Sequence, residues 1–302
     1  MGLRYIFRKL YQGLSPKNLK SIFTKPNMPE PKSFDLAHAP HGMGNYIPGL
    51  VSFIVPTMHR KKTESLNRLI QPLHTLRELL CDIHTNVTVP FEVVVVCNEV
   101  DNKEYIEFVQ TSEHISRSCQ NSENIGVPRS WNMGAQLAKG EYLCFVNDDV
   151  EVGPGAVESM VETLAADPAI GMVGPSGVLW HRQEPGPAVG LTHVEEADAI
   201  GGWLFMTPQN IFVACGGFDT AYTPALMEEI DYSFSVRNKG YKCIVIPGLH
   251  VAHHHIDGAS SSDLPLRAIG YSLLRDALTA RNRAYFERKW QSFWEGEGSE
   301  RS

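Results

Sequence analysis

The stretch that most constrains the fold of this chain is Glu141–Val150, EYLCFVNDDV. Tyr142–Val146 has the length and the β-branched and aromatic content of a buried strand, and it ends at Asn147, Asp148 and Asp149. Open α/β sheets bind their ligands at the carboxyl ends of their strands. Carboxylates there suit a hard divalent cation, which in turn can hold a diphosphate. A solvated acidic turn is the competing interpretation, because Asn and Asp favour turns.

Composition narrows the class of protein. The 302 residues are enough for one large α/β domain or two smaller ones, and 43% hydrophobic with 20% charged residues is ordinary for a soluble globular protein. The net charge of −7 gives no reason to expect a nucleic-acid partner. Six scattered cysteines without a CxxC pair indicate a reducing compartment. No apolar run approaches the roughly 20 residues of a membrane span, so a cytoplasmic location is expected.

The charge is unevenly distributed. Residues 1–50 hold seven Lys or Arg against Glu30 and Asp35, a balance of +5, which leaves −12 for residues 51–302. Residues 1–20 contain Leu3, Ile6 and Leu10 at helical spacing among basic residues. Such a segment can lie on the anionic inner face of a membrane, pack on the domain or form a loose arm. Residues 24–48 are rich in Pro and Gly, so residues 1–47 are predicted to be a basic segment and linker.

Strand and helix patterns alternate from Val51 onward, which predicts βαβ units and a mainly parallel sheet flanked by helices. Strands are expected at Val51–Val55, Phe91–Val96, His114–Ser118, Ile170–Val173 and Tyr241–Ile246. Helices are expected at Thr63–Cys81, Lys103–Gln110, Pro154–Ala166, Glu228–Asn238 and, beyond Leu264, through Arg281–Trp290. The Pro- and Gly-rich residues 174–199 are expected to form a loop beside the site, and Ala199–Met206 a strand or buried turn.

The order of short motifs between Val51 and His255 resembles that of family-2 glycosyltransferases with the GT-A fold. The shared motifs are Pro56-Thr57, Asn124-x-Gly126, Asn132-x-Gly134, Gly140-Glu-Tyr, Gly216-Gly-Phe-Asp219, Glu228-Glu-Ile-Asp231 and a final His. The resemblance implies a GT-A domain over residues 48–260, followed by a helical extension over 261–302. Two positions depart from the family pattern. Cys97 stands where an Asp often contacts the nucleotide base, and Asn147 stands at the first acidic position of the metal motif.

The resemblance also implies where the chemistry takes place. Asp149 and His253 are expected to bind Mn²⁺ or Mg²⁺, with Asp148 reaching the ribose or the metal, while His254 and His255 compete with His253. By the family pattern Glu229 is the base that accepts the proton of the acceptor hydroxyl, and Glu228 is the other candidate. Both acids could instead complement the dipole of the helix that they begin.

The remaining site predictions concern the two substrates. The expected nucleotide-binding residues are Pro56, Thr57, Arg60, Asn98, Asn124 and Arg129. Gly202 and Trp203 are expected to contact the acceptor, although core packing is an equal alternative for Trp203. The segment Arg281–Trp290 is expected to pack on the domain, with acceptor phosphate or membrane as its other candidate partners.

The resemblance implies an inverting, metal-assisted transfer of a sugar from a nucleotide-diphosphate donor, by default a UDP-sugar, to a glycan or lipid-linked acceptor. A role in polysaccharide biosynthesis would follow. A sugar-phosphate nucleotidyltransferase is a second hypothesis, but it calls for a Gly-rich loop after the first strand, and Pro56–Lys62 contains no Gly. Cys97 and Asn147 keep open a third, an inactive nucleotide-sugar-binding scaffold subunit.

Overall fold

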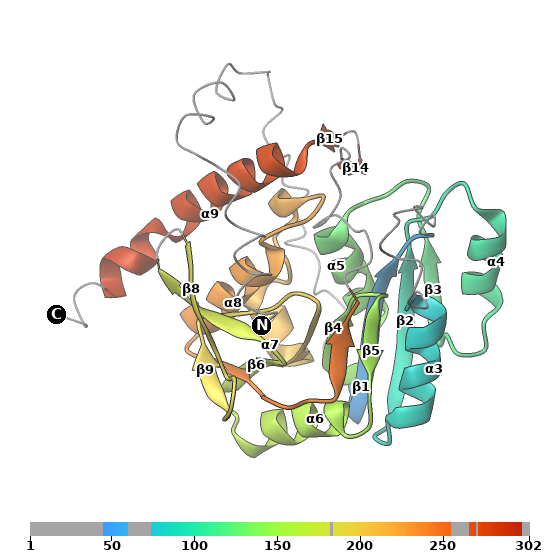
Figure 1. The fold of residues 1–302 in the computed structure, drawn as a ribbon, viewed down its shortest axis with the longest axis horizontal. Helices are drawn as coiled ribbons and strands as arrows, with labels where there is room; N and C mark the ends of the chain where they lie inside the picture. The colour runs from blue at the N-terminus through green and yellow to red at the C-terminus, as the bar shows by residue number, and fades with distance from the viewer. Residues whose placement is uncertain (1–44, 60–73, 182–183, 255–265, 270, 298–302) are drawn as a thin grey trace.

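The computed structural model describes residues 45–59, 74–181, 184–254, 266–269 and 271–297 (Figure 1). An eight-stranded sheet forms the centre of the described part. In spatial order its strands are β3 (Arg117–Gln120), β2 (Phe91–Cys97), β1 (Ile47–Thr57), β4 (Gly140–Val146), β11 (Leu204–Pro208), β6 (Ile170–Gly174), β12 (Lys242–Val245) and β9 (Glu195–Ala197).

The first four strands of this order are parallel to one another. β1 lies between β2 and β4, with Val51 opposite both Phe91 and Tyr142. β6 and β12 are also parallel, whereas β11 and β9 run antiparallel to their neighbours. The predicted α/β class with a mainly parallel sheet is therefore confirmed. The carboxyl ends of β1, β2 and β4 meet at one edge of the sheet, which is where ligands bind in such sheets.

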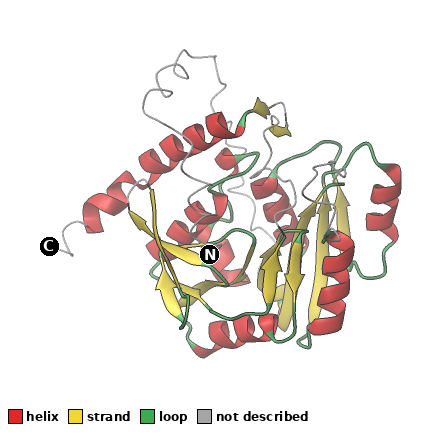
Figure 2. Ribbon diagram, in the orientation of Figure 1, coloured by secondary structure: helices red, strands yellow, loops and turns green. Residues whose placement is uncertain are grey.

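Helices cover both faces of this sheet (Figure 2). They are α3 (Leu76–Asn86), α4 (Lys103–Thr111), α5 (Val127–Leu137), α6 (Ala156–Ala166), α7 (Gln209–Cys215), α8 (Glu228–Asn238) and α9 (Arg275–Glu297), with a 3₁₀ turn η3 at Thr220–Tyr222. Alternation along β1 sends Phe53 and Val55 into the core beneath α3, α4 and α6, and Ile54 into the core beneath α5, α7 and α8. The sequence of β2 is almost continuously apolar because both faces of this strand are buried.

Three smaller sheets surround the large one. They are β10 (Ala199–Ile200) with β7 (Gly177–His181) and β8 (Glu184–Val189), β13 (Val251–His253) with β5 (Val150–Val152), and β14 (Leu266–Ala268) with β15 (Tyr271–Leu273). The prediction of a loop over residues 174–199 is wrong, because this segment contributes three strands. Pro185 and Pro187 lie in β8, which is the edge strand of its sheet and pairs with β7 among the described residues, a position where missing amide donors are tolerated.

Some boundaries also differ from the prediction. α3 spans Leu76–Asn86, so it begins after two described non-helical residues and ends later than the predicted Cys81, while residues 63–73 of the predicted helix lie outside the described residues. Thr75 caps it, and its backbone amide donates to the Glu78 carboxylate at 2.9 Å, one half of a capping box. β3 lies two to three residues later than predicted, and β14 and β15 precede α9 where only helix was expected.

α9 lies alongside the part of the domain that contains α8 (Figure 1), and it packs there through aromatic side chains. Phe286 and Trp290 of α9 are buried against Phe234 of α8, and Phe286 also contacts Trp180 of β7. The predicted packing of Arg281–Trp290 on the domain is therefore confirmed. None of the helices in the described residues combines the length and apolar character needed to cross a membrane. The basic segment of residues 1–20 lies outside the described residues.

Candidate functional site

The acidic stretch after β4 lies beside the end of β1. The Thr57 hydroxyl donates to Oδ2 of Asp148 at 2.6 Å and is also hydrogen-bonded to the Tyr105 hydroxyl. Asp148 and Asp149 are both buried, which excludes the interpretation of this stretch as a solvated acidic turn. A buried carboxylate needs a cation or hydrogen-bond donors nearby. Thr57 supplies one such donor to Asp148.

Asp149 faces His253, which lies about a hundred residues later in the chain. Oδ1 of Asp149 is 3.2 Å from Nε2 of His253, and the two side chains are largely buried. β13 brings them together, because it pairs antiparallel with β5 and places His253 opposite Val150. Two neighbouring ligands on an octahedral cation with bonds of about 2.1 Å lie about 3 Å apart. The carboxylate and imidazole therefore fit a shared divalent cation.

Trp203 forms one wall beside this pair. Its ring stacks on the His253 ring with a centroid distance of 5.4 Å and an interplanar angle of 4°. The indole N–H donates to Oγ of Ser176 at 3.1 Å, and the backbone oxygen accepts from the Asn147 amide at 3.0 Å. Trp203 therefore links the end of β4 to β13. It packs against the core, as one of the two predictions for it stated, and it also borders the candidate metal pair.

Glu228 and Glu229 begin α8, and Gly202 lies against the second of them. A Cβ atom on Gly202 would lie 2.7 Å from Cγ and 2.8 Å from Cδ of Glu229, so only glycine leaves room for this carboxylate. Burial raises the pKa of Glu229 to about 7, an increase that hydrogen bonds from its own amide and that of Ile230 only partly offset. Glu229 is therefore held beside the turn that carries Trp203, with a pKa near neutrality.

Glu228 has a different environment. Its side chain is buried, and Oε2 has no hydrogen-bond partner among the described residues. Burial, and then the neighbouring charge of Glu229, raise its pKa well above the ordinary value of 4.5. A negative charge on one of two adjacent carboxyls disfavours ionisation of the other. Glu229 is the less buried of the two and the better place for a negative charge.

A cavity of about 1170 Å³ opens at the ends of β1 and β2. It is lined by the turns after these strands, by the start of α4 and by β14 and β15. The lining includes Met58, His59, Asn98, Glu99, Asn124 and Arg267. Arg267 and its neighbours were not predicted as site residues, because nothing in their sequence indicates that a hairpin returns to the first two strands.

Two of the predicted nucleotide-binding residues, Asn98 and Asn124, hold the cavity wall in place through hydrogen bonds. Oδ1 of Asn98 accepts from the Ile125 amide at 3.3 Å, and its Nδ2 donates to Ser130 at 2.9 Å. Asn124 accepts from the Gly126 amide at 2.9 Å and donates to the backbone oxygen of Arg267 at 3.1 Å. These bonds fix the loop that forms the cavity wall.

The other nucleotide-binding predictions fall around this region. Pro56 lies in β1 opposite Val96, and Nε of Arg129 donates to Oγ1 of Thr223 at 3.2 Å. Arg60 and His255 lie outside the described residues.

Glu99 has a role that the sequence did not reveal. Its carboxylate accepts from the amides of His59, Val100, Asp101 and Asn102 and so fixes the turns after both strands.

A second group of potential ligands was also missed. His74, Glu151 and His254 place their ligand atoms within 4.8 Å of one another. His254 was predicted only as an alternative to His253, while His74 precedes α3 and belongs to no motif used above, so the sequence offered no signal that these three residues form a group. It lies on the opposite face of the β5–β13 ribbon from the Asp149–His253 pair.

The chain was compared with known proteins. Residues 52–187 match the family described as glycosyl transferase family 2. An uncharacterized protein, y4gI, of Sinorhizobium fredii is 24% identical over 233 residues, which are 67% of this chain and 24% of that protein. A glucosyl-dolichyl phosphate glucuronosyltransferase of Haloferax volcanii is 27% identical over 188 residues, 56% of each chain. This chain thus spans about a quarter and about half of the lengths of these two relatives.

Among solved structures, a crystal structure of GalNAc-T7 with UDP, GalNAc and Mn²⁺ superposes with a TM-score of 0.55 at 16% identity. The superposition covers 68% of this chain and 43% of that one. At this identity the similarity concerns the fold.

Proposed function

We propose that this chain, a member of glycosyltransferase family 2 with the GT-A fold, transfers a sugar from a nucleotide-diphosphate donor to an acceptor hydroxyl with inversion at the anomeric carbon. The observation that carries the proposal is the position of Gly202-Trp203. Gly202 contacts the carboxylate of Glu229, and Trp203 stacks on His253 of the Asp149–His253 pair. One dipeptide therefore lies between a candidate base and a candidate cation site.

The donor would lie across the carboxyl edge of the sheet. In the lining of the cavity at the ends of β1 and β2, the four acids Glu99, Asp101, Glu104 and Glu123 outnumber the two basic residues Lys103 and Arg267. This negative charge suits a nucleoside better than a diphosphate, because like charges repel. The diphosphate would lie toward Asp149 and His253, which would hold Mn²⁺ or Mg²⁺. Such a cation stabilises the charge that develops on the leaving diphosphate.

The reaction itself is a single displacement. The acceptor oxygen forms a bond to the anomeric carbon, the bond from that carbon to the diphosphate oxygen breaks, and the acceptor proton passes to Glu229. A pKa near 7 leaves a useful fraction of Glu229 ionised at neutral pH and able to take this proton. Burial and the charge of Glu229 raise the pKa of Glu228 well above its usual value, and its Oε2 has no hydrogen-bond partner among the described residues, so Glu229 is the proposed base.

Fewer contacts indicate where the acceptor would bind. The outward part of Trp203 offers a surface on which a sugar ring can stack. The Haloferax relative is named for transfer onto a dolichyl-phosphate-linked sugar. We therefore propose a glycan or lipid-linked glycan as the acceptor and a UDP-sugar as the first donor to assay.

The test measures release of nucleoside diphosphate from UDP-, GDP- and dTDP-sugars by the full chain, with and without Mn²⁺ and with a soluble glycan acceptor. Glu229→Gln should lower turnover roughly a hundredfold, the range for losing a general base, with little change in donor KM. Glu228→Gln is the matched control and should have a milder effect. If Glu228→Gln is inactive and Glu229→Gln is not, the two roles are exchanged. If both variants keep normal turnover, the acidic pair is structural.

A further inference from the structure

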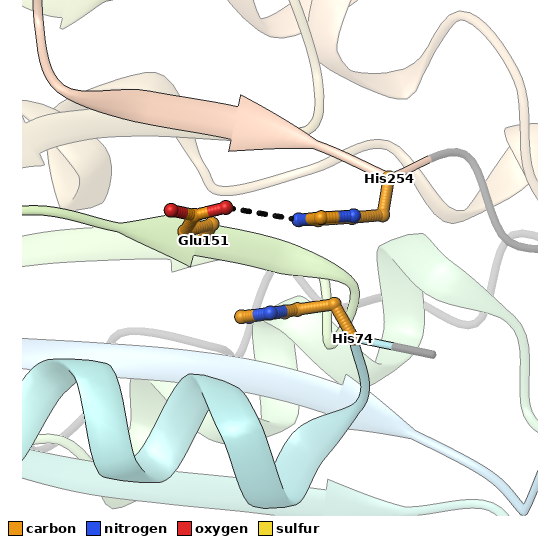
Figure 3. A group of neighbouring side chains, drawn as sticks. All are labelled: His74, Glu151 and His254. Atoms are coloured by element: carbon orange, nitrogen blue, oxygen red, sulfur yellow. Dashed lines mark hydrogen bonds and ion pairs between the residues drawn. The ribbon is translucent and has the colours of Figure 1, made fainter. Parts of the chain in front are cut away.

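Three side chains from separate elements meet on the outer face of the β5–β13 ribbon (Figure 3). His74 precedes α3, Glu151 lies in β5 and His254 follows β13. Each offers one ligand atom, and these atoms all lie within 4.8 Å of one another. Nε2 of His254 is 3.2 Å from Oε2 of Glu151. The two imidazole rings are stacked, with centroids 4.6 Å apart and an interplanar angle of 4°.

The strand pairing fixes two of these positions. Glu151 lies opposite Ala252, and His254 is two residues further along, so both side chains point to the same face of the ribbon. The His254 amide also donates to the backbone oxygen of Asp149 at 3.0 Å, which holds His254 in line with the ribbon. His253 points to the other face, where it meets Asp149 and Trp203. His253 and His254, although consecutive in the chain, therefore belong to two different groups of potential ligands.

His74 supplies the third position from a nearly buried side chain. It is 9% exposed, and its Nε2 makes no hydrogen bond to any of the described residues. Oδ2 of Asp82 lies 3.4 Å from this nitrogen, and the Val152 amide holds the same oxygen at 3.2 Å. Carboxylates commonly lie beside histidines that bind metals, where they orient the ring. Asp82 would also add negative charge close to a bound cation.

We propose that His74, Glu151 and His254 form a second divalent-metal site, of the type that prefers zinc. Two imidazoles and one carboxylate are a common zinc set, with water as the fourth ligand, whereas Mg²⁺ and Ca²⁺ prefer oxygen ligands. Ligands on one tetrahedral zinc ion lie about 3.3 Å apart, given bonds of about 2.0–2.1 Å. Glu151, whose side chain is 55% exposed, can rotate toward such a position, and one imidazole would turn out of the parallel stack so that both rings point at the ion.

The site would connect the start of α3 to the ribbon that carries His253. A metal that binds only the folded chain raises its stability, so the ion would strengthen the attachment of this ribbon to α3. The inference does not depend on the proposed glycosyl transfer, because neither a donor nor an acceptor takes part in it. Its test can therefore fail while the proposed function stands, and the reverse also holds.

The experiment titrates Zn²⁺ into the full chain, without an affinity tag, in competition with a chromogenic chelator. Glu151→Gln and His74→Gln should each weaken the affinity of this site at least tenfold. The matched control is His193→Gln, which removes a histidine that is 72% exposed and lies 4.0 Å from Glu195, a similar pair on the surface. This control should bind Zn²⁺ as the parent does. Asp149→Asn should also retain this site, because its ligands are separate from Asp149.

Thermal unfolding provides the second measurement. Saturating Zn²⁺ should raise the Tm of the parent and of His193→Gln by several degrees, and this increase should be much smaller in Glu151→Gln, where only a cation at Asp149 and His253 could still contribute. Melting without metal shows whether each variant folds, and the exposed Glu151 is the substitution best tolerated. The proposal is overturned if folded Glu151→Gln and His74→Gln bind Zn²⁺ like the parent. It is equally overturned if only Asp149→Asn loses binding, since a single site at Asp149 would then account for it.

Discussion

At the scale of single residues, the pKa of Glu229 sets the expected pH dependence of the transfer. Burial raises this pKa to about 7, and a general base must be ionised to accept a proton. The ionised fraction, and with it turnover, should therefore rise with pH, roughly tenfold between pH 6 and pH 8. The measurement is kcat at saturating donor across this range. Glu229→Gln should lose this dependence, and an equally steep profile in that variant would show that another group titrates.

Asp149 is the residue on which metal binding should depend most. Its carboxylate is buried and lies 3.2 Å from Nε2 of His253, whereas the neighbouring Asp148 accepts a hydrogen bond from Thr57. Asp149→Ala should abolish transfer even at high Mn²⁺, and an excess of chelator should abolish transfer by the parent. Glu107→Ala, which removes an exposed acid on α4, is the control and should remain fully active. Full activity of Asp149→Ala in excess chelator would end the metal hypothesis.

At the scale of helices and strands, the sequence predicted elements that local patterns define. α8 spans Glu228–Asn238, as expected, and the acidic strand end after Val146 lies at the sheet edge where it was predicted. The strands within residues 174–199 were missed because they depend on pairing with each other and with β12 and not on their own apolar pattern. The start of α3 was also misplaced, although the Thr75–Glu78 capping box is a local signal that could have corrected it.

The candidate site also contains residues that the sequence analysis predicted and residues that it missed. The Asp149–His253 pair joins residues about a hundred positions apart, and spacing alone could not have paired them, whereas the family resemblance did. His74 and the β14–β15 hairpin belong to no motif in that resemblance, so neither was predicted at a site. Their positions depend on how distant segments return to the sheet, and a single sequence carries little information about this.

The attachment of α9 to α8 allows a prediction about the stability of the chain. Nζ of Lys289 lies 2.7 Å from a carboxylate oxygen of both Asp219 and Asp231, and the side chain of Asp231 is only 3% exposed. Lys289→Met would leave two carboxylates without their cation, one of them buried. This should lower the free energy of unfolding by about 2–3 kcal/mol. Urea unfolding of the full chain at pH 7 measures the change.

The matched control is Lys242→Met. Lys242 pairs with Asp167 at 3.6 Å, and both side chains are more than 40% exposed, so this substitution should change stability by at most about 0.5 kcal/mol. Equal effects of the two substitutions would mean that Lys289 does not anchor α9. Because Asp231 lies two residues after Glu229, this anchor also holds the helix that carries the proposed base.

At the scale of the whole molecule, charge is separated along the chain. Residues 1–20 contain five basic residues and no acid, Arg4, Arg8, Lys9, Lys17 and Lys20, while residues 51–302 carry a net charge of −12. An anionic membrane surface attracts the first segment and repels the rest. If the acceptor is lipid-linked, the basic segment would bring the domain to the surface where that acceptor lies. Membrane binding and catalysis should then be separable by truncation.

Deletion of residues 1–20 should therefore reduce binding to vesicles that contain anionic lipid and leave turnover of a soluble acceptor unchanged. Each basic residue near an anionic surface contributes about 1 kcal/mol at physiological ionic strength, so losing five should weaken binding by well over a hundredfold. Sedimentation with vesicles at low and high salt measures this, because screening should reduce the difference between the two forms. A variant that replaces the five basic residues with Gln keeps the chain length and should behave like the deletion. Equal binding of the full and truncated chains to anionic vesicles would show that residues 1–20 do not act as a membrane contact.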